Sequence, residues 1–306
     1  MIKAAVDVGS NSVLLLVEEG DAHSRKPILE RSWVTGLGTG TRATGVLAED
    51  AMSRTLGAVL EAFGMARSMH ADRIIAAATM AARIASNTQE FLDRAAMQDT
   101  PIAVLSGDDE AHLGFKAVED DPTFAALQKI TIVDVGGHST EIATASKASE
   151  RWIEEFRHSF PIGTLGLKST TLQAECPSGP DLLAAAVEID DCLKPVRESG
   201  PAGTPVVLGA TGTNLVTLRK KMIHWDPARV HGRWLEFGEI SRSVSSLYQL
   251  TEAERAKLPG MEEGRGPSLP AGALILERAL FALNAKGCFV SVRGWRHALL
   301  DREFQG

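Results

Sequence analysis

The sequence predicts an α/β protein built from two similar halves. Segments with strand-like and helix-like patterns alternate along the whole chain. The turn motif Asp-Val-Gly-x-x-Ser occurs twice, starting at Asp7 and again at Asp134, each time between two apolar runs. A length of 306 residues suits two domains. The repeated turn therefore indicates an internal duplication.

The first half is expected to open with two strands, Ala4–Val8 and Val13–Glu18, on either side of the first turn. Apolar spacing then predicts a helix from about Glu49 to Met69 and a strand over Arg73–Met80. Asn87 is a candidate N-cap for the helix TQEFLDRAAM. The strand PIAVLS precedes a helix beginning GDDEAHLGFKAV, whose acidic first turn suits the positive end of the helix dipole.

The polar stretch EDDPT marks the expected domain boundary, which gives a first domain of residues 1–119 and a second of residues 120–306. After it come the strands KITIVDV and EIATAS, with the second turn between them. A helix over about Asp181–Glu198, the strand PVVLGA and a helix from about Asn214 follow. The helix AGALILERALFALNA leads to the strand CFVSV and to a terminal helix that can pack back on the first domain.

Composition and charge narrow the functional classes. The chain is 44 % hydrophobic and 23 % charged, as is typical of a globular protein, and no apolar run reaches the length of a membrane span. A formal net charge of −7 argues against a protein that coats nucleic acid or lies on a membrane surface. The three cysteines are scattered without metal-type spacing, and the N-terminus shows no signal-peptide pattern. These features predict a reduced, cytoplasmic protein without nucleic-acid or membrane partners.

Both turns have the composition of phosphate-binding loops. In a tight glycine-containing turn, successive backbone N–H groups can converge on an anion, and hydroxyl or amide side chains add donors. The candidate phosphate-binding residues are Ser10, Asn11 and Ser12 in the first turn and Gly136, Gly137, His138, Ser139 and Thr140 in the second. The alternative is a pair of ordinary hairpin turns whose Asp and Ser side chains bond to local backbone. The repetition favours the binding interpretation.

Carboxylates accompany both turns. Asp7 and Asp134 stand at strand ends, and their charge would repel phosphate. They suit Mg²⁺, directly or through its water shell, and Mg²⁺ in turn holds phosphate oxygens. Glu141 is close enough in sequence to join them, so these three residues are the candidate metal ligands.

A series of blocks extends over nearly the whole chain: AAVDVGSNS, AATMAARIASNTQEFL, IAVLSGDDEAHLGF, IVDVGGHSTEI, SFPIGTLGL, VVLGATGTNL, RVHG, LPAGALIL and SVRGWRHALL. In this order they resemble the exopolyphosphatase and guanosine pentaphosphate phosphohydrolase family, within the sugar kinase and actin-like ATPase superfold. The resemblance implies two similar actin-like α/β domains around a cleft, with the two turns facing each other across it. A homodimer is implied by the same resemblance only.

The resemblance also assigns two roles that the residues alone do not. Glu110, in SGDDEA, matches the family's general base, which orients and deprotonates the attacking water. Arg83, in ATMAAR, matches the family's arginine beside the phosphates. Without the resemblance, Glu110 would be interpreted as an acidic residue that complements a helix dipole, and Arg83 as a surface arginine.

The chain departs from the family pattern at several positions. His138 stands where the second turn usually has a third glycine, and Asp109 replaces the more usual Glu beside the base. Gly36 takes the place of an Arg, and Pro267 and Val292 each take the place of an Asp. Such losses suggest altered substrate choice or reduced activity. The proposed base and both turn aspartates are retained, which favours an active enzyme.

The sequence therefore predicts a Mg²⁺-dependent phosphohydrolase that releases terminal phosphate from linear phosphoanhydrides. Inorganic polyphosphate is the first choice of substrate, and guanosine pentaphosphate, which needs the same chemistry, is the alternative. A regulator that binds polyphosphate or an alarmone without turnover is a rival from another class, but the retained Glu110 argues against it. A kinase of the same superfold is a third possibility, for which no acceptor pocket is visible.

Overall fold

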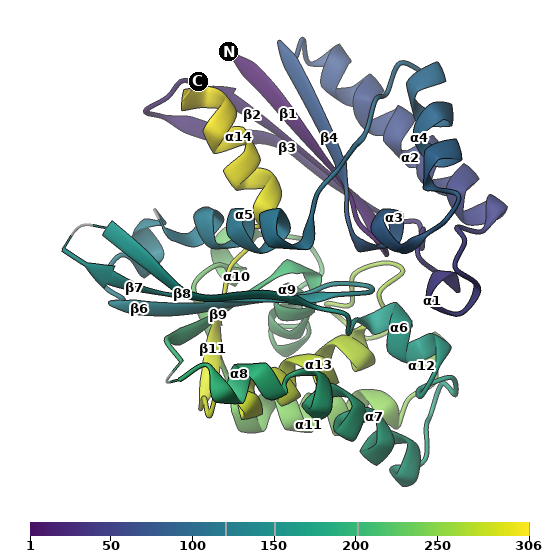
Figure 1. The fold of residues 1–306 in the computed structure, drawn as a ribbon, viewed down its shortest axis with the longest axis vertical. Coiled ribbons are helices and arrows are strands. Elements are labelled where there is room, and N and C mark those ends of the chain that lie inside the picture. Colours follow the sequence, from purple (N-terminus) through teal and green to yellow (C-terminus); the bar gives the residue numbers. More distant parts are fainter. Residues whose placement is uncertain (120, 150, 201, 306) are drawn as a thin grey trace. The chain divides into compact units, whose positions relative to one another are not determined.

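The computed structural model describes residues 1–119, 121–149, 151–200 and 202–305 and divides into two units. One unit comprises Met1–Leu113 with Trp295–Gly306, and the other comprises Gly114–Gly294 (Figure 1). The division lies inside helix α5, which runs over Gly107–Glu119. Asp120, the expected first residue of the second domain, lies outside the described residues, so a boundary after Glu119 stays a prediction.

The sheet of the first unit has the strand order β3-β2-β1-β4-β5. Its first three strands form an antiparallel meander, and β4 and β5 add to β1 in parallel. The strands are β1 Ile2–Val8, β2 Ser12–Gly20, β3 Arg25–Val34, β4 Arg73–Ala78 and β5 Ala103–Val104.

Helices cover both faces of this sheet because successive residues of a strand point to opposite sides. Ala4 and Val6 of β1 belong to the apolar cluster that includes α2, whereas Ala5 packs with Leu300 and Phe304 of α14. The helices of this unit, besides the start of α5, are α1 Thr41–Thr44, α2 Glu49–Ser68, α3 Met80–Ile84, α4 Thr88–Met97 and α14 Trp295–Gln305.

The sheet of the second unit has the order β10-β11-β9-β6-β7-β8. Strands β6, β7 and β8 form an antiparallel meander, and β9 lies parallel to β6 on its other side. The strands are β6 Lys129–Val135, β7 Thr140–Ala148, β8 Arg151–Phe160, β9 Thr204–Leu208, β10 Arg233–Glu236 and β11 Gly287–Val290.

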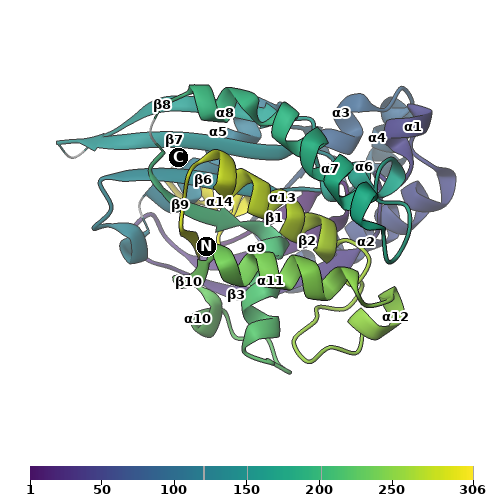
Figure 2. The same cartoon turned by 90° about the horizontal axis from the view of Figure 1, so that it is seen from below.

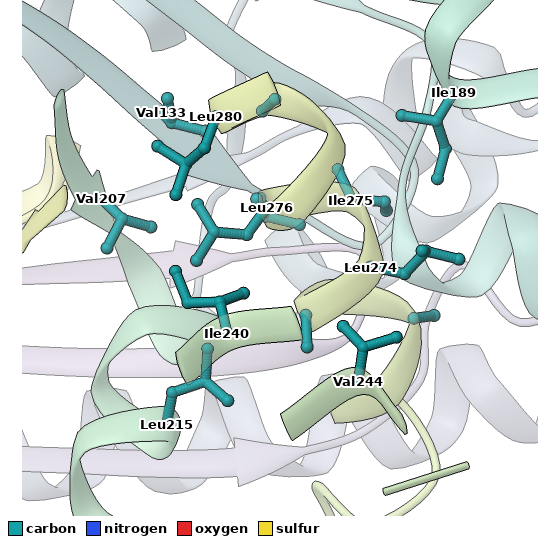
Figure 3. Packing of buried hydrophobic residues seen from close by; sticks show 14 of the residues in the cluster. Val133, Ile189, Val207, Leu215, Ile240, Val244, Leu274, Ile275, Leu276 and Leu280 are labelled. Carbon is teal, nitrogen blue, oxygen red and sulfur yellow. The ribbon is translucent and has the colours of Figure 1, made fainter. Parts of the chain in front are cut away.

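The larger apolar core of the second unit lies between its sheet and a helical layer. Val133 and Val207 on the strands belong to one buried cluster with Leu276 and Leu280 of α13 and Ile240 of α11 (Figure 3). Helices α7, α13 and α11 lie side by side in this layer (Figure 2). The helical segments are η1 Pro122–Phe124, α6 Thr164–Ser169, α7 Gly179–Cys192, α8 Lys194–Glu198, α9 Gly209–Arg219, α10 Pro227–Val230, α11 Phe237–Tyr248, α12 Glu252–Arg255 and α13 Leu269–Ala282.

The two units share one core topology. In each, three consecutive antiparallel strands are followed by a fourth strand that lies parallel to the first: β1, β2, β3 and β4 correspond to β6, β7, β8 and β9. The predicted fold class, α/β with two similar domains, is confirmed. Within the described part of the chain, no helix is long and apolar enough to cross a membrane.

Three local expectations are wrong. Strand β4 ends at Ala78 instead of Met80, because the chain turns there into α3. Helix α9 begins at Gly209, directly after β9, and not near Asn214. Asn87 precedes α4 as predicted but caps no helical N–H; its side chain instead pairs with both backbone groups of Leu47, at 2.8 and 3.0 Å.

Candidate active site

The two repeated turns are closed by the same hydrogen bond. Gly9 N–H donates to Ser12 O at 2.9 Å, and Gly136 N–H donates to Ser139 O at the same distance. A Cβ atom on Gly9 would lie 3.1 Å from Ser12 O, and one on Gly136 would lie 2.9 Å from Ser139 O. Each turn is therefore too tight for a side chain at its glycine, which explains why both copies of the motif carry glycine there.

The first turn is anchored on both sides by backbone bonds. Ser10 O accepts from Gly38 N–H at 2.8 Å, and Asn11 O accepts from Gly36 N–H at 3.0 Å. Ser10 Oγ accepts from Ala81 N–H, in the first turn of α3, at 3.1 Å. The carbonyls of this turn are thus engaged in binding the protein itself. Ser12, at the start of β2, is buried.

Arg83 and Glu110 form a buried ion pair in the first unit. Arg83 Nη1 lies 2.8 Å from Glu110 Oε2, and the same nitrogen donates to Leu105 O at 2.8 Å. Arg83 belongs to α3, whose Ala81 contacts Ser10, so this helix connects the first turn to the proposed base. The structure therefore brings Ser10, Arg83 and Glu110 into one group of contacts, although they are far apart in sequence.

Burial controls the acidity of Glu110. The residue is 9 % exposed, and burial raises the pKa of its carboxyl group above the usual value, since the nearby Arg83 offsets only part of this effect. A raised pKa makes a carboxylate more basic. A general base works best when its pKa lies near the operating pH. The pKa shift of Glu110 therefore has the direction that base catalysis requires.

The second turn packs against the start of α6. Thr164 N–H donates to Gly136 O at 3.0 Å, and Leu165 N–H donates to Gly137 O at 2.7 Å. A Cβ atom on Gly163 would lie 2.5 Å from the Gly137 carbonyl, so only glycine allows this approach. Residues 163–165 belong to the block SFPIGTLGL, to which sequence reasoning assigned no role.

The side chains of the second turn are less available than the sequence suggests. Thr140 Oγ1 donates to Ile162 O at 2.7 Å and is fully buried. The His138 side chain is 3 % exposed, and Ser139 is buried as well. Backbone N–H groups of this turn are therefore better placed to meet an anion than its side chains are.

Asp134 and Glu141 lie directly opposite each other on β6 and β7. Glu141 Oε1 accepts from Ser159 Oγ, on β8, at 2.6 Å. Gly209, the first residue of α9, has a φ of +74°, and a Cβ atom on it would lie 2.8 Å from Asp134 Oδ1. The structure thus adds Ser159 and Gly209 to the predicted residues around this carboxylate pair.

This pair of carboxylates fits Mg²⁺. Within the described ranges, no three His, Cys, Asp or Glu side chains group closely enough to hold a metal ion by themselves. Mg²⁺ is usually held by one or two carboxylates, with water and substrate phosphates as its other ligands. Asp134 and Glu141 meet that requirement within the second unit. Asp7 belongs to the first unit, buried beside the first turn, and its part in a shared metal site stays a prediction.

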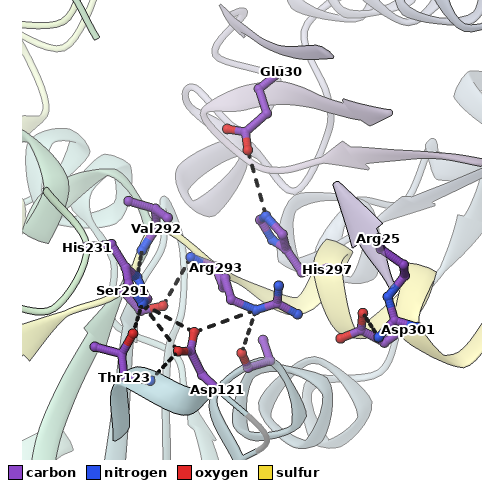
Figure 4. A network of polar contacts seen from close by, with 11 residues as sticks. Arg25, Glu30, Asp121, Thr123, His231, Ser291, Val292, Arg293, His297 and Asp301 are labelled. Carbon is purple, nitrogen blue, oxygen red and sulfur yellow. Dashed lines mark hydrogen bonds and ion pairs between the residues drawn. The ribbon is translucent and has the colours of Figure 1, made fainter. Parts of the chain in front are cut away.

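His231 belongs to a polar network that the sequence did not reveal. Its Nε2 lies 2.9 Å from Thr123 Oγ1 and 3.3 Å from Asp121 Oδ2, and its Nδ1 accepts from Val292 N–H (Figure 4). Because Nδ1 is an acceptor, the proton of a neutral ring is on Nε2 and faces Asp121. Although burial raises the pKa of Asp121, hydrogen bonds from His231 and Thr123 outweigh burial and hold it below its usual value. The network joins three segments of the second unit and is structural.

In chemical terms, the described residues offer two glycine turns of identical closure, a buried carboxylate with raised pKa beside an arginine, and a separate pair of carboxylates. The model of the Ppx/GppA phosphatase family matches residues 16–305. The chain belongs to this family. The resemblance stated from the sequence is thereby confirmed.

Relatives of known name and structure agree with this assignment. Exopolyphosphatase 2 of Mycobacterium tuberculosis is 27 % identical, over 97 % of this chain and 96 % of its own length. Exopolyphosphatase 1 of the same organism is 26 % identical, over 97 % and 87 %. The crystal structure of the Aquifex aeolicus member of the Ppx/GppA family is 28 % identical, covers 99 % of this chain and 97 % of its own, and superposes with a TM-score of 0.79.

Proposed function

We propose that this protein is an exopolyphosphatase, a hydrolase that releases terminal phosphate from inorganic polyphosphate. The observation that carries the proposal is the buried Glu110, whose pKa is raised and whose carboxylate contacts Arg83. Family membership and the names of the two mycobacterial relatives support the same reaction. A location in the cytoplasm and a homodimeric state stay predictions from the sequence.

In the proposed reaction, Glu110 accepts a proton from the water that attacks the terminal phosphorus. The bond between this phosphorus and its bridging oxygen then breaks, which releases phosphate and a polyphosphate shorter by one unit. Arg83 Nη1 is shared between Glu110 and Leu105 O, so Nη2 is the nitrogen left to approach a phosphate oxygen; its one described contact is a weak one to Met80 Sδ at 3.5 Å. Arg83 thus orients the base and neutralises developing charge.

The turns supply anion contacts in this proposal. Backbone N–H groups around Asn11 in the first unit and around Gly137 and His138 in the second would bind non-bridging oxygens. Asp134 and Glu141 would hold Mg²⁺, with Asp7 as a third candidate ligand. When bound, Mg²⁺ would offset the negative charge of the phosphate chain.

The decisive experiment compares phosphate release by wild type, Glu110→Gln and Asp108→Asn. Long-chain polyphosphate and guanosine pentaphosphate serve as parallel substrates in the presence of Mg²⁺. Glu110→Gln should lower kcat by roughly 10²–10⁴, the usual contribution of a positioned base. Asp108 is an exposed acid on the same helical turn, so its variant should keep wild-type activity.

The outcomes separate the hypotheses. Faster release from polyphosphate supports the proposal, and faster release from guanosine pentaphosphate reassigns the substrate within the same chemistry. Equal activity of wild type and Glu110→Gln would mean that the base is another residue. Tight binding of polyphosphate without any phosphate release would establish the regulatory function instead.

A further inference from the structure

Arg255 is a buried cation without a carboxylate partner among the described residues. It is the last residue of α12 and is 2 % exposed. Its Nη1 and Nη2 reach only the backbone oxygens of Leu247 and Glu175, both at 3.4 Å, and its Nε has no hydrogen-bond partner in the same part of the chain. A buried charge is costly unless it is paired, so this guanidinium calls for an anion.

A second donor faces the same place. Tyr248, at the end of α11, is buried, and its hydroxyl likewise has no partner in the described part of the chain. Burial raises the pKa of Tyr248, although Arg255 lies near enough to oppose the shift, so the hydroxyl keeps its proton. Tyr248 and Arg255 line one cavity together with Pro267. Two unused donors from different helices therefore meet there.

The carboxylates around this cavity are already engaged. Glu252 Oε1 accepts from Lys168 Nζ at 2.5 Å. Glu175 Oε2 accepts from Glu252 N–H at 3.4 Å. Neither carboxylate forms an ion pair with Arg255 within the described residues, which leaves the guanidinium to an external ligand.

The cavity is small. Its volume is about 10 Å³, which is room for one water molecule or one monatomic ion. A tetrahedral phosphate is too large for it, so the anions of the proposed reaction are not its occupants. We propose that the cavity formed by Arg255, Tyr248 and Pro267 is a binding site for a monovalent halide, with chloride as the abundant candidate.

Pro267 offers a way to test this. It lines the cavity, and its neighbour Gly266 packs against Arg255, with a Cβ position 3.7 Å from Arg255 Cβ. It is also a position at which this chain lacks an acidic residue of the family pattern. A carboxylate introduced at position 267 should compete with the halide for Arg255.

The experiment measures the thermal unfolding of the full chain in sodium chloride and in sodium gluconate at equal ionic strength. Gluconate is too bulky for the cavity. For the wild type, chloride at roughly ten times its dissociation constant should raise Tm by about 2–5 °C. Pro267→Asn, which adds a side chain of the same shape without charge, should keep a chloride-dependent rise. Pro267→Asp should lose it and unfold at the same Tm in both salts.

Crystals soaked in bromide provide a test that does not depend on the stability of a variant. An anomalous peak within contact distance of Arg255 Nε and Tyr248 Oη would support the proposal. A water molecule at that place with no anomalous signal would overturn it. A chloride-dependent rise that persists in Pro267→Asp would also overturn it, because the ion would then act elsewhere.

Discussion

Gly209 holds its position against Asp134 because it lacks a side chain. Its φ of +74° lies in the left-handed region, and a Cβ atom there would be 2.8 Å from Asp134 Oδ1. An ordinary van der Waals contact begins near 3.4 Å, so Gly209→Ala must move the carboxylate or the start of α9 by about 0.6 Å. Two separate costs therefore follow from one added methyl group.

The first cost is thermodynamic. An L-residue in the left-handed region costs roughly 1–2 kcal/mol, so Gly209→Ala should lower the free energy of unfolding by at least this amount. Gly45→Ala is the matched control, because Gly45 has a φ of +73° and nothing within 4 Å of its Cβ position. Urea denaturation of both variants should show a similar penalty for the backbone.

The second cost is catalytic and distinguishes the two variants. Functional groups must be held within about 0.5 Å of their productive geometry, and a misplacement of about 1 Å can cost on the order of 10²-fold in rate. Gly209→Ala should therefore lose roughly 10- to 100-fold in phosphate release from polyphosphate, whereas Gly45→Ala should keep wild-type activity. Full activity of a folded Gly209→Ala protein would show that the position of the Asp134 carboxylate does not matter for the reaction.

Two further predictions concern titrating groups. Glu110 acts as a base only when ionised, so activity should fall as the pH drops through its raised pKa; Arg83→Met removes the charge that lowers this pKa and should move the acidic limb of the kcat/KM profile to higher pH. Arg83→Lys should restore most of the wild-type limb, and an unshifted limb in Arg83→Met would contradict the coupling. Asp121 has a lowered pKa, so its ion pair stabilises the fold at neutral pH and is lost as the pH falls through that pKa. His231→Phe should therefore cost about 1–3 kcal/mol of unfolding free energy at neutral pH and less in acid, measured by urea denaturation; an equal loss at both pH values would indicate a packing defect instead.

Features that depend on neighbouring residues were predictable from the sequence. The long helix expected from about Glu49 to Met69 is α2, Glu49–Ser68, and the helix expected from the letters TQEFLDRAAM is α4. The repeated turns were predictable for the same reason: the bond from Gly9 to Ser12 and its counterpart in the second turn each span three residues. Local hydrogen bonds and apolar periodicity are properties of short segments.

Cap and boundary errors arose where distant segments compete with local preference. Asn87 has the right residue type and position for an N-cap, but Leu47 takes both polar atoms of its side chain. Helix α9 starts at Gly209 because the end of β9 lies beside Asp134, a neighbour that strand pairing supplies and sequence distance conceals.

The groups of residues on which function depends were settled by tertiary structure. Glu110 became recognisable as a candidate base through family resemblance, but its raised pKa comes from burial, and its contact with Arg83 joins residues of two helices. The pairing of Asp134 with Glu141 follows from the register of two strands, and the burial of Arg255 from the closure of helices around it. Local sequence encodes turns and helices, because their bonds join near neighbours. Burial and ion pairing arise only when distant segments pack together, and these decide the charge and basicity of the candidate site.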